Sequence, residues 1–235
     1  MSARIVLSMK VWGRQSPLRQ EWGKMSMIAD DGRTDIPLSA IEPSGLWHRL
    51  KTGTQATHAR LDGRIMAGRP FESLERYALF LRVQHDFHLI VSPFYRHAAL
   101  ALLLPDLEGR DRLSRIEQDL RDLGIAIPAR PGAEPDHLNN RHRSLGWLYV
   151  AEGSNLGAAF LLKAARQLDL SESFGARHLA AAPEGRGRHW KTFTTALDDI
   201  ALSSAEEAEV IAGANEAFER VLHFVERRFF SAAAD

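Results

Sequence analysis

Residues 146–163 read GWLYVAEGSNLGAAFLLK and decide the fold of this chain. Apolar residues recur in this stretch at helical spacing, so the sequence predicts an α-helix over roughly residues 142–169. The stretch holds three glycines, although each interior glycine costs a helix about 1 kcal/mol relative to alanine. Gly153 and Gly157 lie one turn apart and share a face, with Gly146, Val150 and Ser154 beside them. This glycine strip predicts a close approach of the helix backbone, either to a planar ligand or to another helix.

Helical patterning continues on both sides of the glycine strip. Apolar residues between Trp47 and Ile65 follow alternating spacings of three and four, which predicts another amphipathic helix. Ser73 is placed to cap a further helix, and Ser204 with Glu207 forms a capping-box pattern for the last one. No segment of useful length alternates with period two, so strands are not expected. The sequence therefore predicts an all-α bundle of about seven to eight helices.

The domain boundary falls near residue 45. Residues 1–44 carry scattered basic residues and several prolines, which predicts a poorly ordered N-terminal extension. Residues 45–235 are expected to form a single domain, because nothing in the composition suggests two cores.

Composition excludes several classes of function. The chain has 235 residues with thirty of each charge sign, so no overall field favours nucleic acid or a membrane. It contains no cysteine, which rules out disulfides, thiolate catalysis and a cysteine ligand to heme iron. Iron bound here would need nitrogen or oxygen ligands. No apolar run is long enough to span a membrane, and the expected location is the cytoplasm.

His58 is the sharpest single candidate among the histidines. It falls within the apolar stripe of the first predicted helix, where a histidine is more often a core residue than a ligand. Heme needs an axial base on one face and uncluttered access on the other, and His58 with the glycine strip would supply both. The same strip fits the small-x-x-x-small pattern of two packed helices. Spacing leaves both interpretations open.

The remaining histidines give weaker signals. His85 and His88 have a spacing that could share a metal, but without a repeated Glu-x-x-His pattern they are expected on a solvated helix face. No catalytic role is assigned to the isolated histidines His137, His142, His178, His189 and His223. The chain also lacks a phosphate-binding glycine loop, a dinucleotide fingerprint and a nucleophile elbow.

The residues just described resemble a known family. Residues 146–161 strongly resemble the distal helix of bacterial heme oxygenases, in the branch that serves iron uptake and bacteriophytochrome chromophore supply. The likeness continues through FGARHL at 174–179 and WKTF at 190–193, and THARL at 57–61 resembles the proximal helix. It extends from about residue 46 to the C-terminus.

The resemblance implies roles for the candidate residues. His58 becomes the axial ligand of the heme iron, and Gly153 and Gly157 let the distal helix pass over the oxygen-binding face. Such a pocket should lack a side chain that drives peroxidase chemistry, since oxygen must attack the porphyrin's own meso carbon. Ser154 lies beside the glycines, and Tyr149 with Phe160 would wall the heme pocket. Plain core packing would explain Tyr149 and Phe160 equally well.

The resemblance also requires cations for the two heme propionates. Lys51, two turns before His58, is the first choice, and Lys163 near the end of the distal helix is the second. Some relatives carry a lysine one position later, where this chain has Ala164, and a polar amide in place of Lys51. Because the propionate contacts fix how heme is rotated, these departures affect which meso carbon is cut. The expected product is biliverdin IXα.

The implied activity is heme oxygenase. Heme, O2 and electrons from an external reductase or ferredoxin would yield biliverdin, CO and ferrous iron, and a bacteriophytochrome is a candidate recipient of the biliverdin. The chain shows no flavin or NAD motif, so the reductant would be a partner protein. One alternative is a non-catalytic heme-binding or heme-transfer protein of the same fold. Another is a helical interaction module whose glycines only pack helices.

Overall fold

The structure of the chain is a computed structural model that describes residues 45–127 and 140–231. These residues form seven α-helices and no strand, which confirms the all-α expectation. The helices are α3 (Leu46–Ala67), α4 (Leu74–Tyr95), α5 (Ala98–Ala101), α6 (Leu113–Asp122), α7 (Arg141–Ala165), α8 (Arg186–Asp198) and α9 (Ser204–Phe229). Three single turns of 3-10 helix lie between them: η1 (Glu108–Arg110), η3 (Arg166–Leu168) and η4 (Arg177–Leu179). The extension expected over residues 1–44 lies outside the described residues.

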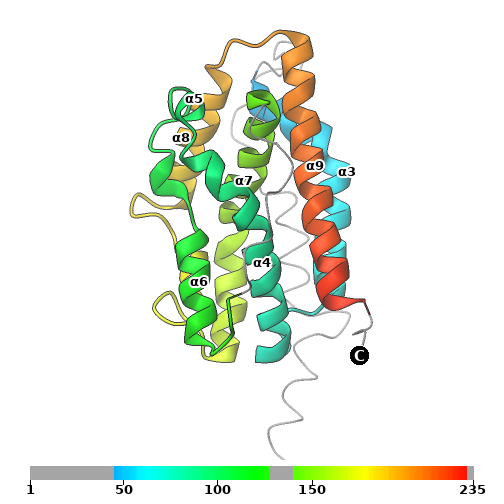
Figure 1. Cartoon of the computed structure of the whole chain (residues 1–235), viewed down its shortest axis with the longest axis vertical. Coiled ribbons are helices and arrows are strands. Elements are labelled where there is room, and N and C mark those ends of the chain that lie inside the picture. The colour runs from blue at the N-terminus through cyan, green and yellow to red at the C-terminus, as the bar shows by residue number, and fades with distance from the viewer. Residues whose placement is uncertain (1–44, 128–139, 232–235) are drawn as a thin grey trace, which may run out of the picture.

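The long helices run roughly along one common direction (Figure 1). Helix α9 packs against α3, α4 and α7, and α6 packs against α4 on the other side. Helix α8 lies against both α7 and α3. The glycine-bearing helix α7 is therefore covered by neighbours on several sides, and it shares α9 and α8 with α3.

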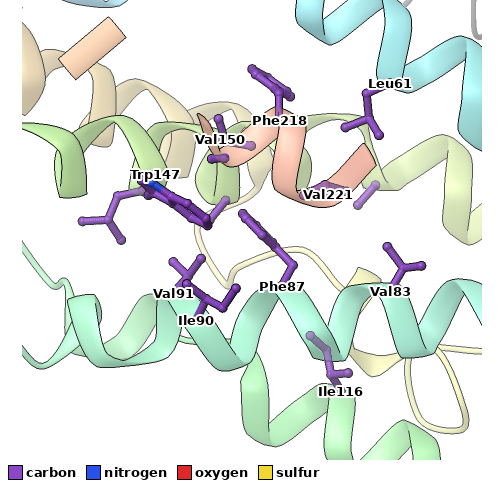
Figure 2. Packing of buried hydrophobic residues seen from close by; sticks show 14 of the residues in the cluster. Leu61, Val83, Phe87, Ile90, Val91, Ile116, Trp147, Val150, Phe218 and Val221 are labelled. Atoms are coloured by element: carbon purple, nitrogen blue, oxygen red, sulfur yellow. The ribbon is translucent and has the colours of Figure 1, made fainter. Parts of the chain in front are cut away.

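Aromatic and branched side chains from α3, α4, α6, α7 and α9 fill the centre of the bundle (Figure 2). The ring of Trp147 on α7 stacks on Phe87 of α4, with centroids 5.9 Å apart, and Phe94 meets the same indole edge-on. Val150 of α7 and Val221 of α9 are also buried. Fully burying one such side chain stabilises a fold by roughly 1.5–3 kcal/mol, so this core fixes how α7 lies against α4 and α9.

The helix ends mostly follow the sequence signals. Ser73 caps α4 by accepting a hydrogen bond from the backbone N–H of Arg76. The capping box of α9 lies one residue earlier than predicted, because Ser203 and Glu206 make the reciprocal bonds. Ser203 and Ser204 each have a glutamate three residues later, so the pattern alone could not choose between them.

Candidate functional site

His58 lies in the middle of α3 with its ring only half-covered. Its side chain is 43% exposed, whereas Thr54 and Leu61 on the same stripe are buried. The ring meets Phe218 of α9 edge-on, with centroids 5.4 Å apart. His58 is therefore held at the edge of the core, with one side of its ring packed and another side accessible.

Asp62 sits one turn after His58 and faces its ring. The Nδ1 atom of His58 is 3.4 Å from Oδ2 of Asp62, and this buried oxygen has no hydrogen-bond partner in the structure. Burial raises the pKa of the Asp62 carboxyl, and the charge of His58 opposes that shift. A carboxylate at one ring nitrogen is the usual way to orient an imidazole that coordinates metal through the other. The pair thus leaves Nε2 of His58 as the ring nitrogen available to coordinate a metal.

The first glycine of the strip serves helix packing. A Cβ atom at Gly146 would overlap the backbone of α9 at Val210 and Ala214. Reciprocally, a Cβ at Gly213 of α9 would overlap the backbone of Arg143 on α7. These two glycines let α7 and α9 cross with their backbones in contact. For Gly146, the helix-packing interpretation is confirmed.

The second glycine has a different neighbour. A Cβ atom at Gly153 would lie 3.6 Å from the indole of Trp190 on α8, an ordinary van der Waals distance. Gly153 and Gly157 are both half-buried, and no residue between them except Asn155 is fully buried. The middle of α7 therefore faces a side chain rather than a neighbouring backbone.

Tyr149 connects the glycine-bearing helix to the helix of His58. Its hydroxyl interacts with the side chain of Thr54, one turn before His58 on α3. Its ring tilts against that of Trp190, with centroids 5.6 Å apart. Burial raises the pKa of Tyr149 to about 12, against the opposing effect of the Thr54 side chain, so the hydroxyl keeps its proton at neutral pH. This one side chain thus links α7 to α3, the helix of His58, and to Trp190 of α8.

The other predicted site residues are more dispersed. Ser154 is exposed and donates its hydroxyl to the Ala151 carbonyl at 2.7 Å within α7, about 100° around the helix from Gly153. Phe160 is half-buried, Lys163 is exposed on the last turns of α7, and Lys51 is half-buried on α3. The structure does not place Ser154 on the face of Gly153 and Gly157.

The solvated-face expectation for His85 and His88 is wrong. Both are buried, because α4 passes between α6 on one side and α7 and α9 on the other. Burial, assisted by the charge of Arg112, lowers the pKa of His88 to about 3 and keeps its ring neutral. A helix covered on two sides shows no clear polar stripe, so the sequence pattern could not reveal this burial.

His178, which was assigned no catalytic role, forms a buried pair. Its Nδ1 lies 2.8 Å from Oδ2 of Asp119 on α6, and the backbone N–H of His178 donates to the same oxygen at 2.9 Å. Nearby, Asp122 accepts from the backbone N–H of Gly175 at 2.8 Å. Gly175 has a φ of 71°, which few other residues adopt easily. The stretch 174–179, part of the family resemblance, is thus an anchored loop on α6.

A second set of polar residues was not predicted from the sequence to form a site, and its member His189 was assigned no catalytic role. Glu152 of α7 is buried and meets Tyr95, Arg110 and His189. These partners lie 57, 42 and 37 positions away in the chain, so no local motif joins them. Only Glu152 itself stood inside a recognised stretch, directly before Gly153.

Within residues 45–127 and 140–231, no helix is both long and apolar enough to cross a membrane.

Comparison with known proteins agrees with this geometry. The family model for heme oxygenase matches residues 44–227. The heme oxygenase PigA of Pseudomonas aeruginosa is 41% identical over 181 residues, covering 77% of this chain and 91% of that protein. A heme oxygenase of Xanthomonas campestris pv. campestris is 30% identical over 109 residues, covering 46% of this chain and 64% of the relative. The NO- and CO-bound heme oxygenase from Neisseria meningitidis, a crystal structure, has a TM-score of 0.72 at 40% identity, covering 81% of this chain and 95% of that one.

Proposed function

Because the chain belongs to the heme oxygenase family, we propose that its substrate heme lies between α3 and α7 with His58 as the axial ligand of the iron. The protein is a heme-degrading oxidoreductase, as its family membership shows. The observation that carries the ligand assignment is the His58–Asp62 contact. A buried carboxylate oxygen without another partner faces Nδ1, and the ring keeps an accessible side. An N–H donated from Nδ1 to Asp62 would satisfy that oxygen and direct Nε2 to the iron.

Gly153 and Gly157 are the residues we assign to the opposite face of the heme. Helix α7 carries no side chain at either position, so its backbone can come close to a planar ligand. In this placement Tyr149, whose hydroxyl interacts with Thr54, would close the heme pocket between α7 and α3, and Phe160 would extend the same wall. Bound heme supplies the iron at which oxygen is activated and the porphyrin carbon that is attacked. The chain's part is to orient heme and leave the oxygen-binding face free of bulk.

Lys51 and Lys163 are the proposed cations for the propionates. Lys51 lies two turns before His58 on α3, and Lys163 lies near the C-terminal end of α7. The two lysines therefore sit on the helices assigned to the two heme faces. Paired with the propionates they would set the rotation of heme in the pocket, and the expected product is biliverdin IXα. Exchange of Lys51 for Gln, followed by chromatography of the biliverdin isomers, tests whether this lysine sets the isomer.

The proposed reaction also needs a second substrate, an electron donor and a recipient for its product. O2 and electrons from an external reductase or ferredoxin would complete the reaction, with CO and ferrous iron released beside biliverdin. The wider biological setting would be the cytoplasm, with a bacteriophytochrome as a candidate recipient of biliverdin. These assignments rest on the family branch that the glycine-bearing helix resembles.

The test of the site is His58→Ala with hemin titration and a turnover assay. The variant should lose the spectrum of histidine-ligated heme and form no biliverdin with ascorbate or a reductase. It should keep its fold, because the ring is half-exposed. His223→Ala is the matched control, since His223 is exposed on α9 and belongs to no proposed site. Unchanged heme spectra and turnover in His58→Ala would refute the ligand assignment, and bound heme that resists turnover in the unaltered protein would favour the non-catalytic alternative.

A further inference from the structure

A buried cluster of charged and polar groups surrounds the carboxylate of Glu152 on α7. The Tyr95 hydroxyl donates to Oε1 at 2.8 Å, and Nη1 of Arg110 donates to Oε2 at 2.9 Å. Nε2 of His189 lies 3.3 Å from the same Oε2. Glu152 is 1% exposed and Arg110 is 4% exposed, so the ion pair is shielded from water. Three segments, the end of α4, η1 and the first turn of α8, thus converge on one residue of α7.

Two partners of Glu152 also bind each other and reach further along α8. The guanidinium of Arg110 donates to the backbone carbonyl of His189 at 3.3 and 3.4 Å and lies over the ring of Phe193. The other ring nitrogen of His189, Nδ1, lies 2.6 Å from the carboxylate of Glu184. Arg110 therefore acts as a bridge between Glu152 and the first two turns of α8.

The position of this cluster in the chain links it to the glycine strip. Glu152 directly precedes Gly153, and His189 directly precedes Trp190. The indole of Trp190 is the group that faces Gly153, at 3.6 Å from its notional Cβ. The cluster thus ties together the two chain positions next to the Gly153–Trp190 contact. Any change in the Glu152–His189 separation would be passed on to that contact.

The start of α8 depends on long-range bonds such as those of the Glu152 cluster. The N-cap of α8 is Gly185, which offers no side-chain cap. The start of α8 must therefore be located by longer-range bonds, from the Glu152 cluster and from Arg186, which donates to the Asn155 carbonyl at 3.1 Å. Stability alone does not explain buried charges, because an apolar replacement of a buried ion pair is often equally stable. Fixed geometry is the property that such a cluster supplies.

We propose that Glu152 is a positioning residue for heme cleavage: through Arg110 and His189 it fixes Trp190 against Gly153 and so sets the approach to the oxygen-binding face. This inference rests on the proposed placement of heme beneath Gly153. The cluster touches neither His58 nor Asp62, so it governs the use of oxygen rather than the affinity for heme. Loss of the carboxylate lets α8 shift relative to the glycine-bearing turn.

Glu152→Gln in the full chain is the primary test. Hemin binding should stay within about threefold of the unaltered protein, while biliverdin formation should fall on the order of 10- to 100-fold, the loss expected when reacting groups are displaced by about 1 Å. The rate of CO association with the reduced heme complex should change as well, because it reports the distal space without turnover. Glu209→Gln, which removes an exposed ion-pair partner of Arg143 on the α7–α9 side, should change none of these.

Two further variants separate positioning from folding. Arg110→Lys keeps the charge opposite Glu152 but loses the forked contact with the His189 carbonyl, so it should lower turnover and alter CO association. Tyr95→Phe removes a bond to Glu152 that has no link to α8, so it should lower turnover clearly less than Arg110→Lys does. If Glu152→Gln does not fold, Arg110→Lys still tests whether the cluster positions α8 for turnover.

The pH profile gives a readout that a purely structural role would not move. The groups facing His189 are Glu152 on α7, Arg110 on η1 and Glu184 in the preceding loop. The hydrogen bond to Glu152 is the largest cause that raises the pKa of His189, and burial opposes it. Turnover should fall as pH rises through the pKa of His189, and Glu152→Gln should move that fall to lower pH.

The proposal is overturned if Glu152→Gln and Arg110→Lys keep normal turnover and CO association. It is equally overturned if hemin affinity falls in step with turnover, or if Tyr95→Phe is as damaging as Arg110→Lys. None of these outcomes depends on His58. Failure of the ligand assignment would instead appear as an unchanged heme spectrum in His58→Ala.

Discussion

Gly146 and Gly153 on α7 are the same residue type but serve different purposes. Gly146 meets the backbone of α9, where a Cβ atom has no room. Gly153 meets the indole of Trp190 at an ordinary van der Waals distance, where a Cβ atom fits. At Gly146 the missing side chain is required by the fold. At Gly153 the fold does not require it, so its absence calls for a functional reason.

The surroundings of the two glycines differ in the same way. Residues 144–148 of α7 are all buried, whereas residues 153–161 alternate between buried, half-buried and exposed. The first half of the helix is thus part of the core. The second half combines a helical backbone with incomplete cover, which suits a surface that receives a ligand.

Gly146→Ala should cause the largest loss of stability. The added methyl group meets the backbone of Val210 and Ala214, which cannot move aside as a flexible side chain would. We expect the free energy of unfolding to fall by about 3 kcal/mol, at the upper end of the usual cost of overpacking. Urea unfolding of the heme-free protein measures it. A stability equal to that of the unaltered chain would show that α7 and α9 do not cross as closely as the structure has them.

Gly157→Leu should give the largest loss of activity with the fold intact. Bulk on the proposed oxygen-binding face should lower biliverdin formation by on the order of tenfold or more while hemin still binds, a difference of about 1.4 kcal/mol or more in the barrier. Hemin titration and single-turnover assays on the same sample separate the two effects. Normal turnover in this variant would remove the reason for placing the glycine face over heme.

The contrast between Gly146 and Gly153 also shows which features of the structure could be predicted from the sequence. The periodicity of α3 and α7 and the glycine spacing are local features, so both helices and a close approach were predictable. The neighbour of each glycine was not predictable. Gly146 and Val210, for example, are 64 positions apart, and only the folded bundle brings them together. The single-residue error in the α9 capping box has a local cause, two serines with equivalent glutamates.

For the candidate site, even fewer of the tertiary partners could be predicted from the sequence. His58 stood out through its stripe and its family motif, but its partner Asp62 was overlooked even though it lies one turn away. The Glu152 cluster had no sequence signal because its members come from four separate segments. Buried polar groups depend on tertiary partners, and a hydrophobic pattern does not encode those partners.

Gly153→Ala is the matched counterpart of Gly146→Ala and should have the opposite sign. Alanine favours a helix interior over glycine by up to about 1 kcal/mol, and the new methyl group would meet Trp190 without overlap. The heme-free protein should therefore become slightly more stable while turnover declines. Thermal unfolding and biliverdin formation are compared in the same preparation. Lower stability would mean that the two glycines serve the same packing role.

The smallest expected effect concerns the boundary between the two halves of α7, where Glu152 holds His189. The pKa of His189 is raised in the folded protein, chiefly by its hydrogen bond to Glu152, while burial lowers it. A raised pKa means that protonated His189 stabilises the fold fully below the ordinary histidine pKa of about 6.5, and that this stabilisation is lost as pH rises through the folded-state value.

His189→Gln should therefore flatten the alkaline loss of stability. Urea midpoints of the unaltered chain and the variant, taken at about pH 5.5 and about pH 8.5, should converge toward the higher pH. All other ionisable groups are present in both proteins and cancel in the difference, so the convergence reports His189. A constant gap between the two proteins across this range would show that His189 is not charged in its contact with Glu152, and the link between α7 and α8 would then depend on Arg110.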